Sequence, residues 1–474
     1  MSTQVLVPKQ EKTQTWFSLV KEAILGSKEN FTAISVDRAI ILLAIPMVLE
    51  MAMEGLFSIV DIFFVGHLGP DATSTVGMTE GLLMIVMSIA VGLSMGAGAV
   101  VARRIGEQDK EGAAVAAVQS IMIGLACGLL IFMIGFPLAP RLLALMGAGP
   151  GILQVGSTYS RIMLGSSGII LMLYLINASF RGAGDAAVAM RVLWVANFIN
   201  ICLDPCLIRG LGPFPRLGVT GAAVSTTIGR SIGLLFQVYL LAKGSGSLKI
   251  LGKHLRLNLQ VMRNIMRIAG NGILQFMVAS ASLVVLIRVI QSFGSAATAG
   301  YTVAIRIVIF SILPSWGLGS AAATLVGQNL GAGHPDRAEQ SVWRAAFFNM
   351  IFLGTVSLIF LLFAPNLVAI FGNGDQEVIR YGANCLRIIS LCYVLYAYGM
   401  VIVQAFNGAG DTRTPTLISL LCFWIIQLPL AFYLGKGLAL GPNGVYFAIL
   451  TAEILLALIA IFIFRLGKWK KKVV

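Results

Sequence analysis

Charged residues are scarce in this sequence: Lys, Arg, Asp and Glu make up 11% of its 474 residues, against about 25% in soluble domains. Hydrophobic residues make up 58%, and the mean hydropathy is +0.90. The low charge excludes an ordinary soluble enzyme, and the apolar content excludes disorder. The apolar residues come in continuous runs rather than in alternation, which excludes a transmembrane β-barrel. The composition predicts an all-α polytopic membrane protein.

Motifs for enzyme chemistry are also missing. The sequence has no G-x-x-x-x-G-K-[ST] phosphate loop with which to hydrolyse ATP, and no H-E-x-x-H zinc motif. Cys202 and Cys206 lie one helical turn apart without a third ligand, so we interpret them as packing residues. The glycine-rich stretch 92–98 falls inside an apolar run, where it indicates close helix packing and not a nucleotide site. We expect no catalytic residue, no metal site and no cofactor.

Twelve apolar runs are long enough to cross a bilayer, which takes about 20 residues. They are residues 38–66, 72–102, 113–136, 152–178, 187–208, 219–242, 263–292, 298–326, 340–364, 378–404, 415–435 and 443–465. We therefore predict twelve transmembrane helices.

The net charge of +14 is distributed unevenly over the loops. With the N-terminus inside, the inner segments carry 24 of the 34 Lys and Arg residues, and the outer loops carry five. This asymmetry predicts a multi-pass protein of the cell (cytoplasmic or inner) membrane with both termini cytoplasmic, and it makes nucleic-acid binding improbable. Residues 1–37 show no signal-peptide pattern. Within them, residues 16–25 form either an amphipathic surface helix or part of a plain tail.

The sequence is an internal repeat. The stretch Phe180–Asp185 (FRGAGD) matches Phe406–Asp411 (FNGAGD) at an offset of 226, and Gly92–Gly106 matches Gly317–Gly331 at 225. Each half holds six spans, so the halves share one orientation and a pseudo-two-fold axis along the membrane normal. The expected domains are a cytoplasmic tail (1–37), an N-lobe (38–243), a cytoplasmic linker (244–261), a C-lobe (262–465) and a basic cytoplasmic tail (466–474).

Six acidic residues fall inside the predicted spans, where a charge costs about 2.5–3.5 kcal/mol or more. They are Glu50, Glu54, Asp61, Glu80, Asp204 and Glu453. The first three have the spacing i, i+4 and i+11, so at about 100° per residue they project within about 40° of one another. The first span therefore carries a stripe of carboxylates, with Pro46 near the same face as a point of weakness.

Judged by depth, Asp61, Glu80, Asp204 and Asn200 should meet in the outer half of the N-lobe. Crowded carboxylates cannot all ionise in a medium of low dielectric constant, so the cluster would bind a proton or a sodium ion. With Glu54, these residues are our ion-coupling candidates. For Glu80, the alternative to ion coupling is a purely structural role. We interpret Asn197 as a residue that forms a hydrogen bond between helices.

Two other acids have alternatives that remain open. Glu50 either lines a substrate cavity or pairs with Arg230 or another buried arginine. Glu453, alone in the last span, either contacts substrate or pairs with Arg288 or Arg306.

The sequence also has patches of aromatic and methionine residues. We expect most of these residues to pack in the core and a few to line a substrate cavity. The candidates for a substrate cavity are Glu50, Glu453, Phe276, Met277, Tyr393 and Tyr396.

Several motifs together resemble those of a known family. They are Ile59-Val60-Asp61 with Phe64 to Gly69, the two Gly-Ala-Gly-Asp loops, Asn200 with Asp204-Pro205, and Gly331 with His334-Pro335-Asp336. Over residues 38–465 the sequence resembles the multidrug and toxic compound extrusion (MATE) family. The resemblance implies a V-shaped pair of six-helix lobes that exports organic cations and amphipathic compounds against inward proton or sodium flow.

Within that family the sequence looks like the DinF-like branch. Asp61, Asn200 and Asp204 match three positions of that branch's acidic network in the N-lobe. Its hydroxyl in the sixth span has no clear match here, because alanines fill part of the stretch; Thr220, Thr226 and Thr227 are nearby. The NorM-like branch has acids in spans seven, eight or ten, where this sequence has Arg288, Arg306 and Arg387. Glu50 and Glu54 do not belong to the DinF-like pattern.

We therefore predict a secondary antiporter that exchanges an organic cation or amphipathic drug for protons, or for sodium, by alternating access. Its partners would be the small-molecule substrate and membrane lipid, and it would act as a monomer. One alternative is a flippase for a lipid-linked substrate, which the arginines in the spans keep open. These arginines are Arg161, Arg230, Arg288, Arg306 and Arg387. Another alternative is a membrane subunit that transports nothing.

Overall fold

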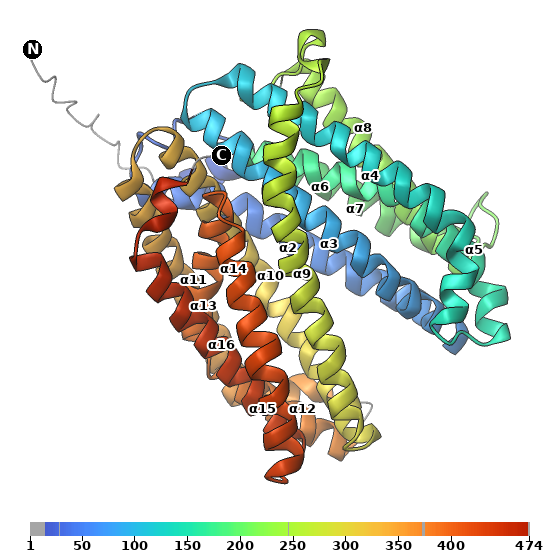
Figure 1. Ribbon diagram of the computed structural model, residues 1–474. Helices are drawn as coiled ribbons and strands as arrows, with labels where there is room; N and C mark the ends of the chain where they lie inside the picture. The colour runs from blue at the N-terminus through green and yellow to red at the C-terminus, as the bar shows by residue number, and fades with distance from the viewer. Residues whose placement is uncertain (1–14, 28, 245, 372–374, 473–474) are drawn as a thin grey trace, which may run out of the picture.

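The computed structural model describes residues 15–27, 29–244, 246–371 and 375–472, and all regular structure within them is helical (Figure 1). The N-terminal half contains α1 (Trp16–Leu25), α2 (Val36–Gly66), α3 (Pro70–Gly106), α4 (Lys110–Leu145), α5 (Pro150–Gly165), α6 (Ser167–Gly182), α7 (Ala186–Arg209) and α8 (Val219–Lys243). After the turn η1 (Gly252–Leu255) come α9 (Leu259–Gln291), α10 (Ser295–Gly331), α11 (Pro335–Ala369), α12 (Gln376–Ser390), α13 (Tyr393–Gly408), α14 (Arg413–Ser419), η2 (Leu420–Gln427), α15 (Leu428–Phe432), η3 (Tyr433–Gly437), α16 (Pro442–Arg465) and η4 (Lys468–Lys471). The predicted all-α class is confirmed.

Among the described residues, eleven helical segments are long and apolar enough to cross a membrane, and the bent pair α12–α13 makes a twelfth. These segments match the twelve predicted runs, but some are not single regular helices. The run 152–178 divides at Ser166 into α5 and α6, where Gly165 to Gly168 consists only of glycine and serine, both weaker helix formers than alanine. The run 378–404 bends by 62° after Ser390, whose hydroxyl donates back to the carbonyl of Arg387.

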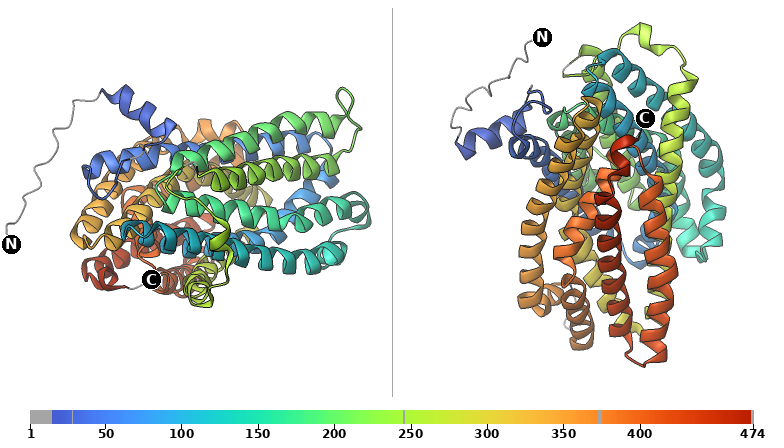
Figure 2. Two further views of the ribbon diagram at one scale, coloured as in Figure 1. Left: turned by 90° about the horizontal axis from the view of Figure 1, so that it is seen from above. Right: turned by 60° about the vertical axis from the view of Figure 1, so that its left-hand side comes forward.

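The helices form two lobes that diverge from one end of the molecule. In Figure 1 the N-lobe, α2–α8, runs from blue to green and the C-lobe, α9–α16, from yellow-green to red, and the two groups of helices spread apart toward the lower part of the picture. The lobes meet at the end that holds α1 and the C-terminal turn η4 (Figures 1 and 2). We call this end the termini side and the opposite end the far side. At the termini side, residues of α2 share a buried apolar cluster with α10, α11, α13 and α16.

Glycines let the two lobes approach closely where α3 packs against α9. A side chain on Gly92 would overlap Ile273, and one on Gly96 would lie 2.7 Å from the carbonyl oxygen of Ile265. This confirms that the stretch 92–98 serves close helix packing.

The two lobes repeat element by element. α3 and α10 are both 37 residues long, and each Gly-Ala-Gly-Asp loop has a glycine in the left-handed region, Gly184 at φ +89° and Gly410 at φ +81°. The two aspartates hold different chain segments. Asp185 accepts a hydrogen bond of 2.7 Å from the backbone N–H of Ser247 in the connection between the lobes. Its counterpart Asp411 lies 3.1 Å from Nζ of Lys472 near the C-terminus.

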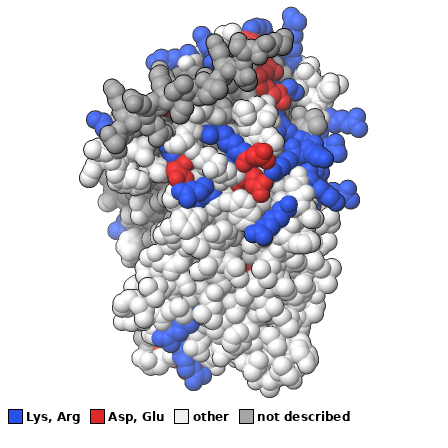
Figure 3. Space-filling model, turned by 90° about the vertical axis from the view of Figure 1, so that its left-hand side faces the viewer, with Lys and Arg blue, Asp and Glu red and all other residues white. Residues whose placement is uncertain are grey.

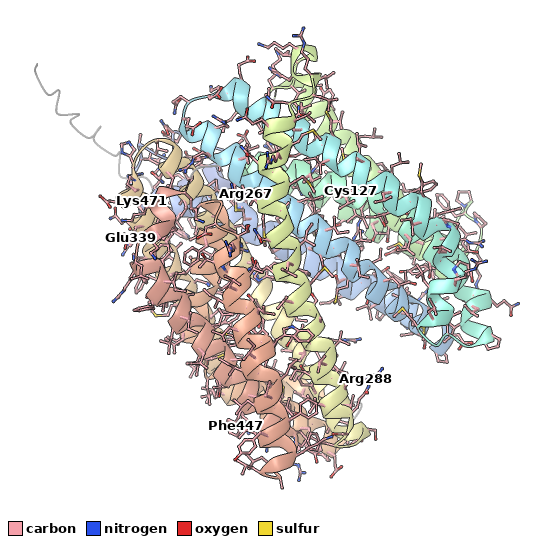
Figure 4. All side chains as sticks on the ribbon, in the orientation of Figure 1. Cys127, Arg267, Arg288, Glu339, Phe447 and Lys471 are labelled. Atoms are coloured by element: carbon pink, nitrogen blue, oxygen red, sulfur yellow. The ribbon has the colours of Figure 1, made fainter. Side chains whose placement is uncertain are left out.

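Charged side chains gather at the termini side, and a broad band below them is almost uncharged (Figure 3). Figure 4 shows Glu339, Lys471 and Arg267 toward that side, whereas Arg288 lies toward the far side. Nζ of Lys470 lies 2.6 Å from Glu339. The stretch 16–25 is helical, as one of its two interpretations predicted, and exposes Phe17 (86%). Residues 1–14 of the predicted tail lie outside the described residues.

Candidate functional site

Three acids from three helices lie together in the N-lobe toward the far side. Asp61 of α2 is within electrostatic range of Glu80 of α3 and Asp204 of α7. Asp204 is fully buried, Asp61 is half-buried and Glu80 is exposed. We call these three residues the far-side acid cluster. The structure thus brings together acids that the sequence predicted to meet, one of them exposed and another fully buried.

Hydroxyl groups of α8 hold the cluster and its asparagine. Ser225 Oγ donates a hydrogen bond to Asp204, and Asn200 Nδ2 donates one of 3.1 Å to Thr226 Oγ1. Thr226 was one of the three predicted candidates, whereas Ser225 was missed. Several hydroxyl residues follow one another here, and the sequence alone does not tell which of them faces α7.

Oxygen atoms in this region lack donors. Asp61 Oδ1, Asn200 Oδ1 and Asp204 Oδ2 are buried and have no hydrogen-bond partner among the described residues. Buried oxygens of this kind are normally paired, so a proton or a small cation would satisfy them. No three His, Cys, Asp or Glu side chains of the described chain lie close enough together to hold a metal ion.

The carboxylate stripe on α2 divides into separate sites. Glu54, predicted with the coupling residues, accepts a hydrogen bond of 3.2 Å from Asn197 Nδ2 of α7. Asn197 is thus a partner between helices, as predicted. α2 runs unbroken through Pro46, so the helix carries the whole stripe.

Deeper along α2, Glu50 lies in a polar network of its own. Its Oε1 accepts from Asn177 Nδ2 at 3.3 Å and lies 3.5 Å from Arg181 Nη1, both on α6. Gln237 of α8 donates to Asn177 Oδ1 at 2.6 Å. We call Glu50, Asn177, Arg181 and Gln237 the Glu50 network. Glu50 thus pairs with an arginine, as one of its alternatives predicted, but the partner is the half-buried Arg181 and not Arg230.

The other three members of the Glu50 network were not predicted from the sequence. Asn177 and Gln237 are polar residues inside apolar spans, and this signal could have identified them. Arg230 instead lies 5.8 Å from the ring of Phe57.

In the C-lobe, Glu453 of α16 forms no ion pair with Arg288, Arg306 or another described basic group. The predicted ion-pair alternative is therefore wrong, since neither arginine lies within ion-pair distance of the Glu453 carboxylate. Glu453 lies within electrostatic range of Tyr396, whose ring is 6.2 Å from that of Tyr393. Tyr393 is buried in the core of the C-lobe, which favours a packing role for it.

The remaining cavity candidates lie on α9. Phe276 packs edge-on against Trp316 of α10 at 6.3 Å, and Met277 is exposed. A hollow at the far-side ends of α9 and α10 has other lining residues, which are Gln291, Gly294, Ser295, Thr298, Ala299, Thr302, Val303 and Arg306. The six predicted cavity residues do not contribute to it. Its Arg306 is within electrostatic range of Glu80 in the other lobe.

Two helical lobes that diverge from one end, with carboxylates buried in apolar helices, define a two-lobed polytopic membrane transporter. The chain belongs to the MatE family, whose model matches residues 46–206 and 255–433. This family is the multidrug and toxic compound extrusion family, so the protein is a membrane transporter and not an enzyme.

Named relatives and solved structures agree with this assignment. The chain is 27% identical to the probable multidrug resistance protein NorM of Thermotoga maritima, over 93% of this chain and 94% of the relative. It is 25% identical to the multidrug export protein MepA of Staphylococcus aureus, over 90% and 93%. A solved outward-facing multidrug resistance MATE family transporter is 27% identical with a TM-score of 0.87, covering 98% of this chain and 100% of that chain.

Proposed function

We propose that this protein is a secondary active antiporter that exports organic cations or other amphipathic compounds in exchange for protons, with sodium as the alternative ion. The observation that carries the proposal is the far-side acid cluster with its unpaired buried oxygens, because such a site binds and releases a cation. The relatives named for multidrug resistance and export support the substrate class. The match of Asp61, Asn200 and Asp204 supports a DinF-like coupling site.

We propose further that the protein lies in the cell membrane with its termini side toward the cytoplasm. Basic residues concentrate at this side (Figure 3), as they do in cytoplasmic loops. The linker 244–261 and both tails would then be cytoplasmic. In a cysteine-free background, Lys253→Cys, at an exposed position of the linker, should resist an impermeant thiol reagent applied to intact cells, and Pro213→Cys should react. Labelling of position 253 from outside would contradict this orientation.

In the proposed cycle, substrate enters between the lobes from the termini side, and the lobes rock so that the far side opens. An external proton loads the far-side acid cluster, beginning at the exposed Glu80 and reaching Asp61. Asp204 and Asn200 hold the network through Ser225 and Thr226. Neutralising Asp61 repacks α2 and expels the substrate, and the protonated carrier then returns. Glu453 and Tyr396 would contact the substrate from the C-lobe.

The test uses the purified protein in proteoliposomes loaded with a fluorescent monovalent organic cation. Export should follow an imposed inward proton gradient, collapse with a protonophore and ignore ATP, since the sequence has no phosphate loop. A response to a sodium gradient alone would replace the proton by sodium. ATP-dependent flux, or no response to either gradient, would contradict antiport.

A further inference from the structure

The Glu50 network lies apart from the far-side acid cluster. Glu50 and Asp61 are 11 residues apart on α2, which at about 1.5 Å per residue separates them by about 16 Å along the helix. The network takes its side chains from α2, α6 and α8. It is therefore a site of its own, nearer the termini side than the cluster.

Only one of the two carboxyl oxygens of Glu50 has partners. Oε1 faces both the Asn177 amide and the Arg181 guanidinium, whereas Oε2 is shielded from solvent and receives no hydrogen bond from the part of the chain that the structure describes. The side chain as a whole is 3% exposed. An ionised carboxylate in this position leaves a charged oxygen unpaired, which is costly in a buried site. A proton on Oε2 removes that charge.

Among the described residues, Arg181 is the only ion-pair partner of Glu50. Four other polar groups lie on the helices around Glu50. They are Tyr174 on α6, Arg230 on α8 at a greater distance, Glu54 on α2 itself and the neutral Asn197 on α7. α10 meets this part of α2 with Phe310, Leu313 and Gly317, which carry no charge. The ionisation of Glu50 therefore decides whether the charge of Arg181 is neutralised.

Arg181 lies where the two lobes are joined on the termini side. Its backbone carbonyl accepts a hydrogen bond of 3.3 Å from Thr324, and the next carbonyl, that of Gly182, accepts one of 3.0 Å from Gln328. Thr324 and Gln328 both belong to α10 of the C-lobe. Arg181 thus connects the buried carboxyl of Glu50 to two of the hydrogen bonds that join the lobes at this side.

We propose that Glu50 is a second proton-binding site, which releases its proton to the termini side and, through Arg181, couples that release to separation of the lobes there. The O–H bond on Oε2 breaks, the proton passes to water, and the carboxylate left behind is neutralised by Arg181. The proposal rests on the proposed proton antiport. The carrier would then have two proton-binding sites on α2. Asp61 takes up its proton from the far side, and Glu50 releases its proton at the termini side.

The test compares wild type with Glu50→Gln in proteoliposomes whose protein has its termini side toward the lumen. Glutamine keeps the size and the acceptor oxygen of the side chain but cannot titrate. Net export driven by an acidic exterior should fall by about tenfold or more and lose its dependence on lumenal pH. Exchange of substrate for substrate at equal pH needs no proton release and should persist. Glu377→Gln, the same change at an exposed site on α12, is the matched control and should behave as wild type.

Two results would overturn the proposal. In the first, Glu50→Gln exports at the wild-type rate with its lumenal pH dependence intact, so Glu50 is a static partner of Arg181. In the second, the variant binds substrate but loses net export and exchange together, so the residue is structural. If Glu50→Gln does not fold, Glu50→Asp decides: its shorter titrating side chain should displace the lumenal pH midpoint of export, and an unchanged midpoint contradicts the proposal. Wild-type export under a proton gradient shows separately whether the proposed antiport itself stands.

Discussion

At the residue scale, individual carboxyl groups have different surroundings, and these separate the candidate ion-binding acids from the acids that hold the structure together. Asp204 is fully buried and held by Ser225, whereas Glu80 is exposed, so one cluster contains both a protected acid and an accessible one. In the loops, the repeated aspartates Asp185 and Asp411 have a different task, since each holds a connecting segment of chain. Of these, Asp185 offers a direct test by pH.

Burial raises the pKa of Asp185 from 3.8 to about 6, although the hydrogen bond from Ser247 acts the other way. The folded protein thus holds this proton more tightly than the unfolded chain does. The resulting contribution to stability is complete below pH 3.8 and is lost as the pH rises through about 6. Asp185→Asn accepts the same hydrogen bond and never ionises. The Tm of this variant minus that of wild type should therefore increase between about pH 4 and about pH 7.

This measurement is a series of thermal unfolding curves of detergent-purified protein. Glu377→Gln is the control, because its acid is exposed. A Tm difference for Asp185→Asn that stays constant over the pH range would show that burial does not control this carboxyl.

Residues of the candidate site were predictable where the sequence shows that placing them inside a membrane span costs free energy. Asp61 and Asp204 stand out because acids are expensive inside apolar runs. Ser225 did not stand out among neighbouring hydroxyls. Arg181 was missed because it lies at the end of a span, and its approach to Glu50 depends on how α6 packs beside α2.

At the element scale, hydropathy predicted the spans but not their interruptions. A run of apolar residues shows that a stretch of chain is long enough to cross the membrane, but it does not show a bend. Residues 378–404 were therefore predicted to form one helix. The bend of 62° between α12 and α13 depends on local hydrogen bonding around Ser390. Likewise, the glycines of 92–98 indicated close packing, but only the fold identifies α9 as the partner helix.

The contact between α3 and α9 predicts a difference between two glycines of the same helix. Gly92→Ala places a methyl group against the backbone of Ile273 and should destabilise the protein by about 1–3 kcal/mol. Gly77→Ala meets nothing within 4 Å, and it should be neutral or stabilising by up to about 1 kcal/mol through helix propensity. Chemical unfolding of both variants in detergent measures the difference. Equal stability of the two would mean that α3 and α9 do not pack this closely.

At the scale of the whole molecule, the arrangement of the lobes fits the proposed direction of transport. The lobes are joined at the termini side and diverge toward the far side (Figure 1), where the N-lobe has the acid cluster and the C-lobe has the hollow of α9 and α10. A carrier in this arrangement would take up its coupling ion from outside. The two-lobe architecture was predictable from the repeat, because both halves share the same loop motifs. The point of lobe contact was not, because it depends on side chains distant in the sequence.

The central claim is that the far-side acid cluster couples proton entry to export, and Asp61→Asn tests it most directly. Asparagine keeps the size of the side chain and its capacity for hydrogen bonds but removes titration. The measurement is export of a fluorescent organic cation from proteoliposomes under an imposed proton gradient, with substrate binding and protein content determined on the same preparation. Our account predicts that the variant folds, retains part of its substrate binding and loses gradient-driven export, and that Asp204→Asn is impaired less completely. Export by Asp61→Asn at the wild-type rate, with the wild-type dependence on pH, would contradict it.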